Sequence, residues 1–132
     1  MSLKALLVVG MAGFVGSVSR YALSGWVARR FGEVYPMGTL VVNLSGCFAV
    51  GFLYYMLEER FLIDPLWRVG LLIGFLGSFT TFSSYGLQTF SLMKQGEVFS
   101  ATTNILISNL VGLALVWLGY SGARLTLERS TW

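Results

Sequence analysis

The chain has no histidine, a single cysteine (Cys47), two prolines and few charged residues. Without histidine or a second cysteine, one chain cannot build a Ser-His or Cys-His catalytic pair, a typical zinc site or a thiol–disulfide couple. Charged residues make up 11% of its 132 residues, whereas about a quarter is usual in a soluble domain. The chain therefore cannot cover itself with polar groups, and we expect its outer surface to face lipid.

Acidic residues are absent from the middle of every apolar segment. They lie at segment ends only: Glu33, Glu58, Glu59, Asp64, Glu97 and Glu128. Proton-coupled transporters and cation channels depend on carboxylates at membrane depth, so both classes are disfavoured. The net charge is only +3 and the basic residues also gather near segment ends. Because no basic stripe forms, a nucleic-acid partner is not expected.

Four apolar runs are long enough to cross a bilayer, since a span needs about 20 mostly apolar residues. They predict helices over residues 3–28, 37–57, 66–93 and 98–120, in a single transmembrane domain of residues 1–132. Asp64-Pro65 is typical of a helix start, with Asp as the cap and Pro in the first turn. The first run lacks a small-residue cleavage site, so we interpret it as a retained helix rather than a signal peptide. The fold class is an all-α, multi-pass membrane protein.

The basic residues predict no strong orientation in the membrane. With four spans, the N-terminus, the 58–68 connection and the C-terminus share one side, whose five basic residues are Lys4, Arg60, Arg68, Arg124 and Arg129. The other side has three, Arg29, Arg30 and Lys94. Positive-inside sorting needs a larger difference, so the chain could insert both ways round. Because four helices are too few to enclose a wide pore, an oligomer is favoured.

The third run contains GFLGSFTTFSSYG, residues 74–86, where glycines flank a cluster of hydroxyl side chains. Glycine costs about 1 kcal/mol relative to alanine within a helix. Hydroxyl side chains compensate backbone groups that a break sets free. We therefore expect this helix to be broken near residues 77–81, where protein or a cavity must shield the backbone. The freed carbonyls would suit an alkali cation, and the freed amides an anion.

Neutral hydrogen-bonding side chains occur at membrane depth. Thr39 and Asn43 share a helix face at i,i+4 spacing, and Ser108 lies on the fourth helix. With three hydroxyls of the third helix they predict a polar track through the bundle; these are Thr81, Ser83 and Ser84. The alternative is that each merely joins two helices, an interaction worth about 1 kcal/mol or less.

Two aromatic residues follow the expected break. Phe82 and Tyr85, at i,i+3 spacing, share one helix face. Aromatic rings have a positive edge, so two edges facing a narrow passage would favour a small anion without any charged residue. The alternative is that the rings face lipid or the core.

Arg20 is a basic residue within the first predicted helix. Its side chain could reach the membrane interface or cap carbonyls, which are structural roles. It could instead attract an anion at a vestibule. The residues leave both roles open.

Four motifs occur in order along the chain: GFVGSVSRY (13–21), GTLVVNLSG (38–46), GFLGSFTTFS (74–83) and SNLVG (108–112). Over essentially its whole length the chain resembles the Fluc/CrcB family of bacterial fluoride channels. The third motif carries the most specific likeness.

The resemblance implies an antiparallel, dual-topology homodimer with two pores in the bacterial inner (cytoplasmic) membrane. Such a dimer exports toxic fluoride from the cytoplasm passively. The resemblance also implies a structural sodium ion at the dimer centre, held by the backbone carbonyls of Gly77 and Thr80. It assigns Asn43, Ser108, Phe82 and position 85 to the anion pathway.

The sequence departs from the family pattern at four positions. Ser78 and Phe79 replace smaller or aliphatic residues near the sodium site, which ligation by backbone carbonyls tolerates. Position 85 is usually Phe and here is Tyr85, whose hydroxyl could donate to fluoride, or narrow or redirect the path. Position 88 is often Glu and here is Gln88, so a role that needs charge is lost. Two other functions stay open: a small dual-topology exporter of the multidrug kind, which lacks its expected buried carboxylate here, and a non-transporting membrane assembly subunit. An enzyme is not expected, because no acid, histidine or metal cluster could perform the chemistry.

Overall fold

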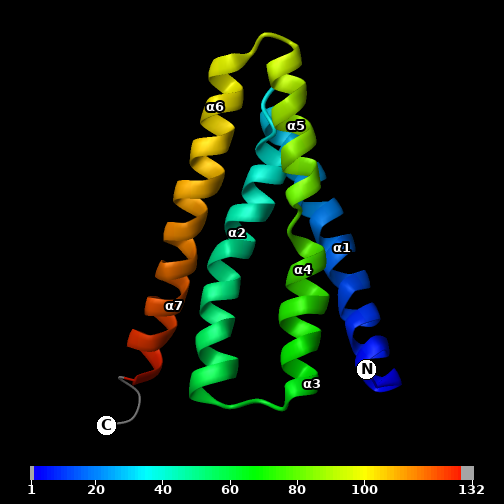
Figure 1. Cartoon of the computed structure of the whole chain (residues 1–132), viewed down its shortest axis with the longest axis vertical. Helices are drawn as coiled ribbons and strands as arrows, with labels where there is room; N and C mark the ends of the chain where they lie inside the picture. Colours follow the sequence, from blue (N-terminus) through cyan, green and yellow to red (C-terminus); the bar gives the residue numbers. More distant parts are fainter. Residues whose placement is uncertain (1, 129–132) are drawn as a thin grey trace.

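The computed structural model describes residues 2–128 as four helical spans that run in alternating directions (Figure 1). The first span is α1 (Leu3–Phe31), and the second joins α2 (Met37–Tyr54) to a π-helical segment, η1 (Tyr55–Arg60). The third consists of α3 (Pro65–Arg68), η2 (Val69–Leu76), α4 (Gly77–Phe79) and α5 (Phe82–Lys94). The fourth consists of α6 (Val98–Leu106), η3 (Ile107–Val111) and α7 (Gly112–Glu128). The all-helical fold predicted from the sequence is confirmed.

Local sequence explains several helix ends. The Asp64 carboxylate accepts a hydrogen bond of 2.8 Å from the Leu66 amide, and Pro65 begins α3. This is the cap predicted from the Asp-Pro pair. At the end of α1, Gly32 has a φ of 85°, a left-handed conformation that favours glycine. All four spans extend beyond the ranges expected from the sequence, the third by one residue at each end and the fourth as far as Glu128.

Few side chains are fully buried within the chain. Val27 of α1 and Val42 of α2 are the largest of them among the described residues. α2 packs along α7, α1 packs against α2, η2 and α4, and α5 pairs with α6. Large apolar residues such as Met11 and Phe14 remain exposed along the outer faces. A chain that buries so little and exposes so many apolar side chains has the surface of a membrane protein.

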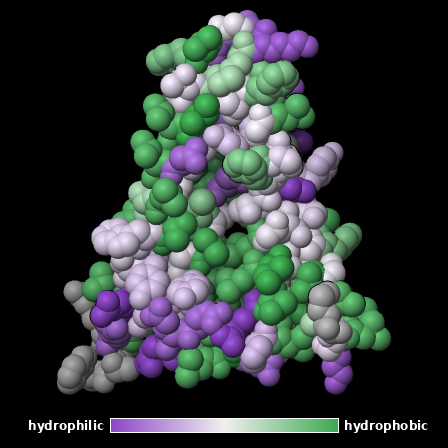
Figure 2. Space-filling model, in the orientation of Figure 1, coloured by the Kyte–Doolittle hydropathy of each residue, from purple (hydrophilic) through white to green (hydrophobic). Residues whose placement is uncertain are grey.

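All four spans are long and apolar enough to cross a membrane. The chain is accordingly a multi-pass membrane protein. Figure 2 shows hydrophobic surface over much of the molecule, with hydrophilic atoms gathered in a band near the lower end. That end holds the start of α1, the connection before α3 and the end of α7 (Figure 1). Arg129, counted above with this end, lies outside the described residues.

Charged side chains meet at this lower end. The Tyr120 hydroxyl donates to the Glu59 carboxylate over 2.8 Å, which joins the ends of the second and fourth spans. Arg68 pairs with Glu58, which joins the second and third spans. The carboxylates therefore serve helix ends, where the sequence indicated they would lie.

Candidate functional site

The third span is interrupted at Thr80 and Thr81. Both residues are extended, with φ and ψ of −82° and 159° at Thr80 and of −150° and 113° at Thr81. The break predicted near residues 77–81 is confirmed, but it is shorter than predicted. Residues Gly77–Phe79 stay helical, and both the amide and the hydroxyl of Thr80 donate to the Leu76 carbonyl at 3.0 Å.

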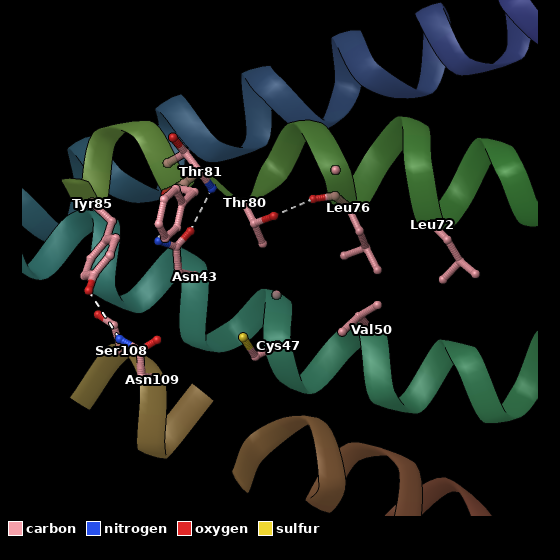
Figure 3. Close-up of a pocket in the computed structure, with 13 residues that line it drawn as sticks. Asn43, Cys47, Val50, Leu72, Leu76, Thr80, Thr81, Tyr85, Ser108 and Asn109 are labelled. Atoms are coloured by element: carbon pink, nitrogen blue, oxygen red, sulfur yellow. Dashed lines mark hydrogen bonds between the residues drawn. The ribbon is translucent and has the colours of Figure 1, made fainter. Parts of the chain in front are cut away.

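Asn43 of α2 satisfies the broken backbone. Its Oδ1 accepts from the Thr81 amide at 2.8 Å, and its Nδ2 donates to the Thr81 carbonyl at 3.0 Å (Figure 3). The two contacts together fix which way the carboxamide faces, because an amide N–H only donates and a carbonyl only accepts. The Asn43 carboxamide thus supplies the acceptor that the Thr81 amide lacks at the break and adds a donor to the Thr81 carbonyl, which is the N-cap carbonyl of α5. One N–H of Asn43 remains for another acceptor.

The Thr81 side chain begins α5. Its Oγ1 accepts from the Ser84 amide at 3.2 Å and donates to the Ser84 hydroxyl at 3.0 Å. The Ser83 hydroxyl lies 3.4 Å from the same oxygen. The threonine is therefore a side-chain N-cap, which satisfies a backbone amide that would otherwise be orphaned inside the bilayer.

A cavity of about 350 Å³ lies beside the break, between α2, the third span and η3 (Figure 3). Its lining is polar but uncharged near the break, with the side chains of Asn43, Thr81, Tyr85 and Ser108. Further along, its lining is apolar. The other lining residues are Gly46, Cys47, Val50, Leu72, Leu76, Gly77, Thr80, Phe82 and Asn109. No acidic or basic residue lines it within the part of the chain that the structure describes.

Gly46 lets α2 approach the break. A Cβ at this position would lie 2.2 Å from Cγ2 of Thr80, far inside contact distance. A side chain here would push α2 away from Thr80 and so move Asn43 relative to Thr81. Gly46, the last residue of the motif at 38–46, is therefore needed for α2 to lie close enough to Thr80 to form this wall of the cavity.

The two rings predicted to share a face do so. The centroids of Phe82 and Tyr85 are 5.4 Å apart, with ring planes at 47°. Phe82 is 82% exposed on the single chain, whereas Tyr85 is half-buried. The Tyr85 hydroxyl accepts a hydrogen bond of 3.2 Å from Nδ2 of Asn109. Both rings line the cavity, and Tyr85 stands at one end of it with Ser108 nearby (Figure 3).

Four of the predicted pathway and vestibule residues lie elsewhere. Thr39 lines a second cavity of about 360 Å³ beside Gln88 and Tyr35, near the connection between α1 and α2. Burial raises the pKa of the Tyr35 phenol there. Ser83 and Ser84 turn toward Thr81 and are not part of the cavity lining described above. Arg20 is half-buried on α1 and forms no ion pair with the described residues.

Two of the polar lining residues, Cys47 and Asn109, were not assigned to the anion pathway from the sequence. Cys47 lies one turn beyond Asn43 on the same face of α2, so helical spacing already indicated it. Asn109 follows Ser108 directly, and a side chain at the next position would normally point about 100° away. Both residues nevertheless line the cavity, and both lie in the π-helical turn η3, which sequence spacing does not reveal.

The backbone carbonyls of Gly77 and Thr80 fit the cation role that the resemblance implies. Within residues 2–128, neither carbonyl accepts a hydrogen bond from the backbone beyond the break, because the Thr81 amide turns to Asn43 and the Ser84 amide to Thr81. Carbonyl oxygens are hard ligands suited to an alkali ion. The described residues include no cluster of acidic, His or Cys side chains that could hold a metal instead.

The family model described as "CrcB-like protein, Camphor Resistance (CrcB)" matches residues 7–120. The chain belongs to the CrcB-like family. Among its relatives it is 42% identical to the fluoride-specific ion channel FluC of Geotalea daltonii, over 92% of this chain and 98% of the relative. It is 40% identical to FluC of Nitratidesulfovibrio vulgaris, over 93% and 99% of the two chains. It is 44% identical to FluC of Opitutus terrae, over 89% and 90%.

These matches confirm the resemblance drawn from the four motifs. The CrcB-like relatives are named as ion channels, so the prediction that this chain is not an enzyme is also confirmed. The match extends across the break, the cavity and both rings, because residues 7–120 contain all of them.

Proposed function

We propose that this chain forms a fluoride-selective channel that lets fluoride leave the bacterial cytoplasm passively and so reduces its toxicity. The observation that carries the proposal is the uncharged, hydrogen-bonding cavity at the helix break. Relatives that cover nearly all of the chain are named fluoride-specific ion channels.

Fluoride is small and strongly hydrated, so a channel must replace the water molecules that it loses. The cavity offers donors for this purpose: the second N–H of Asn43, the Ser108 hydroxyl and the positive edges of the Phe82 and Tyr85 rings. Because none of them carries charge, an anion is stabilised without being held too tightly to leave. Arg20, half-buried on α1, could draw anions toward the membrane but does not line this cavity.

Passive transport is favoured over the two alternatives. A multidrug-type exporter couples to protons through a carboxylate at membrane depth. In the described spans the carboxylates lie at the ends, where Glu58 and Glu59 pair with Arg68 and Tyr120. A non-transporting assembly subunit would have no use for polar groups directed into a cavity.

The proposed assembly is an antiparallel homodimer of dual topology in the bacterial inner membrane. One chain offers two such oxygen ligands, the Gly77 and Thr80 carbonyls, which are fewer than a hard cation takes. A second copy would contribute its own pair, and a bound sodium ion would then hold two breaks together as a structural part. The nearly balanced basic residues at the two ends support insertion both ways round.

The first test is ion efflux from proteoliposomes that contain the purified protein, with fluoride and chloride measured side by side. We expect rapid, electrogenic fluoride efflux and no chloride efflux. A well-folded protein that releases neither ion would leave the assembly subunit as the better function. Fluoride efflux that requires a proton gradient would favour the exporter.

A further inference from the structure

Tyr85 is held directly by Asn109 of the fourth span and, through the Thr89 hydroxyl, by Asn104 of the same span. Its hydroxyl accepts from Nδ2 of Asn109 at 3.2 Å. Its backbone carbonyl accepts from the Thr89 hydroxyl at 2.8 Å, and that hydroxyl accepts from Nδ2 of the buried Asn104 at 2.9 Å. Both ends of the residue are thus anchored, so the ring has a fixed place at the cavity.

The direction of the hydrogen bonds at Asn109 follows from their chemistry. Its Nδ2 also lies 2.8 Å from the Ile105 carbonyl, which can only accept. The amino group of the amide therefore faces both contacts, and its second N–H is donated to the Tyr85 oxygen. The phenolic proton of Tyr85 takes no part in this contact. Among the described residues no acceptor for that proton is found.

We propose that Asn109 is a positioning residue, which orients Tyr85 so that the phenolic O–H donates directly to an anion in the cavity. The inference rests on the proposed function, since the anion in question is fluoride. Both residues line the cavity, and Figure 3 shows the Tyr85 hydroxyl directed toward Ser108 and Asn109. An acceptor bond to Asn109 also polarises the O–H, which strengthens it as a donor. A hydrogen bond to a charged acceptor is about twice as strong as a neutral one.

A hydroxyl that merely narrows the passage has a different signature. Its removal would widen the path and speed fluoride at high concentration, but the half-saturating concentration would hardly change. A hydroxyl that binds the ion instead sets that concentration. The two roles therefore separate when efflux is measured across a range of fluoride concentrations.

The experiment compares wild type, Tyr85→Phe, Asn109→Leu and the double variant in proteoliposomes. For Tyr85→Phe we expect the half-saturating fluoride concentration to rise about tenfold, the weight of one such hydrogen bond. For Asn109→Leu we expect a smaller rise, about threefold, because the ring stays but its hydroxyl is no longer oriented. In the double variant the asparagine change should add nothing, since it acts through the hydroxyl.

Thr103→Val is the matched control, because Thr103 donates only to the carbonyl four residues earlier, as Asn109 does to Ile105. It should leave half-saturation unchanged. Asn109→Ser is a second variant in case leucine impairs folding, as serine cannot reach Tyr85. Two results would overturn this inference and leave the proposed function standing. One is an unchanged half-saturating fluoride concentration in Tyr85→Phe. The other is an effect of Asn109→Leu that persists when the Tyr85 hydroxyl has been removed. Absence of fluoride efflux from wild type would overturn the proposed function, and this inference with it.

Discussion

Asn43 performs two tasks with one carboxamide. Its Oδ1 and one of its N–H groups hold the Thr81 backbone, and the remaining N–H is the one available to the proposed anion. In Asn43→Asp, an oxygen that cannot donate faces the Thr81 carbonyl, and a negative charge is added to the cavity wall. We expect fluoride efflux to fall at least about a hundredfold, in keeping with the loss of a buried hydrogen bond and its replacement by repulsion. Efflux from proteoliposomes measures this directly.

Ser45→Ala is the matched control for that variant. Ser45 lies on the same helix and donates only to the Val42 carbonyl at 2.9 Å, away from the cavity. It should leave efflux unchanged, and size-exclusion profiles should show both variants folded. Wild-type efflux from Asn43→Asp would remove Asn43 from the anion pathway.

Cys47 allows a chemical test of the cavity, because it is the only cysteine of the chain and lines the cavity wall. A methyl-thiosulfonate reagent should form an adduct that intrudes on a space of about 350 Å³. We expect efflux to be inhibited in proportion to labelling. Cys47→Ala should conduct normally and resist the reagent. Complete labelling with undiminished efflux would show that the ion passes elsewhere.

At the scale of elements, the helix break was predictable but its extent was not. Glycines and hydroxyls marked residues 77–81 as weak. Yet Gly77–Phe79 stay helical because Thr80 continues to bond Leu76. The chain leaves the helix only where Asn43 supplies an alternative partner, 38 residues away in sequence. Local propensity cannot report a contact of that kind.

The same limit applies to the polar track. Spacing correctly placed Thr39 and Asn43 on one face of α2, but residues four apart are about 6 Å apart along a helix axis. The cavity ends between them, so Thr39 lines the second cavity near Tyr35. Motif spacing therefore identified the residues at the break itself, namely Asn43, Thr81 and the two rings. It could not say how far the cavity extends.

Close approach of α2 to the break is a property that one substitution can test. In Gly46→Ala the new methyl would meet Thr80, so α2 must shift and the Asn43–Thr81 pair must lengthen. We expect a lower melting temperature in detergent and a fluoride efflux at least about tenfold slower, as one misplaced hydrogen-bonding group would cause. Gly122→Ala on α7 is the control, since a Cβ there meets nothing within 4 Å. It should be neutral or slightly stabilising through helix propensity. Equal behaviour of the two variants would mean that this contact does not support the cavity.

For the whole molecule, the distribution of basic residues between the two ends sets the orientation in which each copy inserts into the membrane. The described part of the lower end has Lys4, Arg60, Arg68 and Arg124, against Arg29, Arg30 and Lys94 at the other. Such a small difference should let half of the copies insert each way. If the working form is antiparallel, biasing insertion must abolish it.

Two lysines added to one end should bias insertion. Leu3→Lys with Leu62→Lys should make the lower end cytoplasmic. Val34→Lys with Gln95→Lys should make the other end cytoplasmic. Three of these positions, Leu3, Leu62 and Val34, have exposed side chains. Expressed alone, each double variant should lack antiparallel partners and fail to protect cells from fluoride. Expressed together, the two should restore protection to near the wild-type level. The uncharged controls are Leu3→Gln with Leu62→Gln for the lower end and Val34→Gln alone for the other end, where Gln95 already stands. Each should protect when expressed singly, because it adds no charge. Labelling from one side of the membrane would check that all copies of a lysine variant share one orientation. If such a variant alone still gave full protection, a single orientation would suffice and the antiparallel assembly would be wrong.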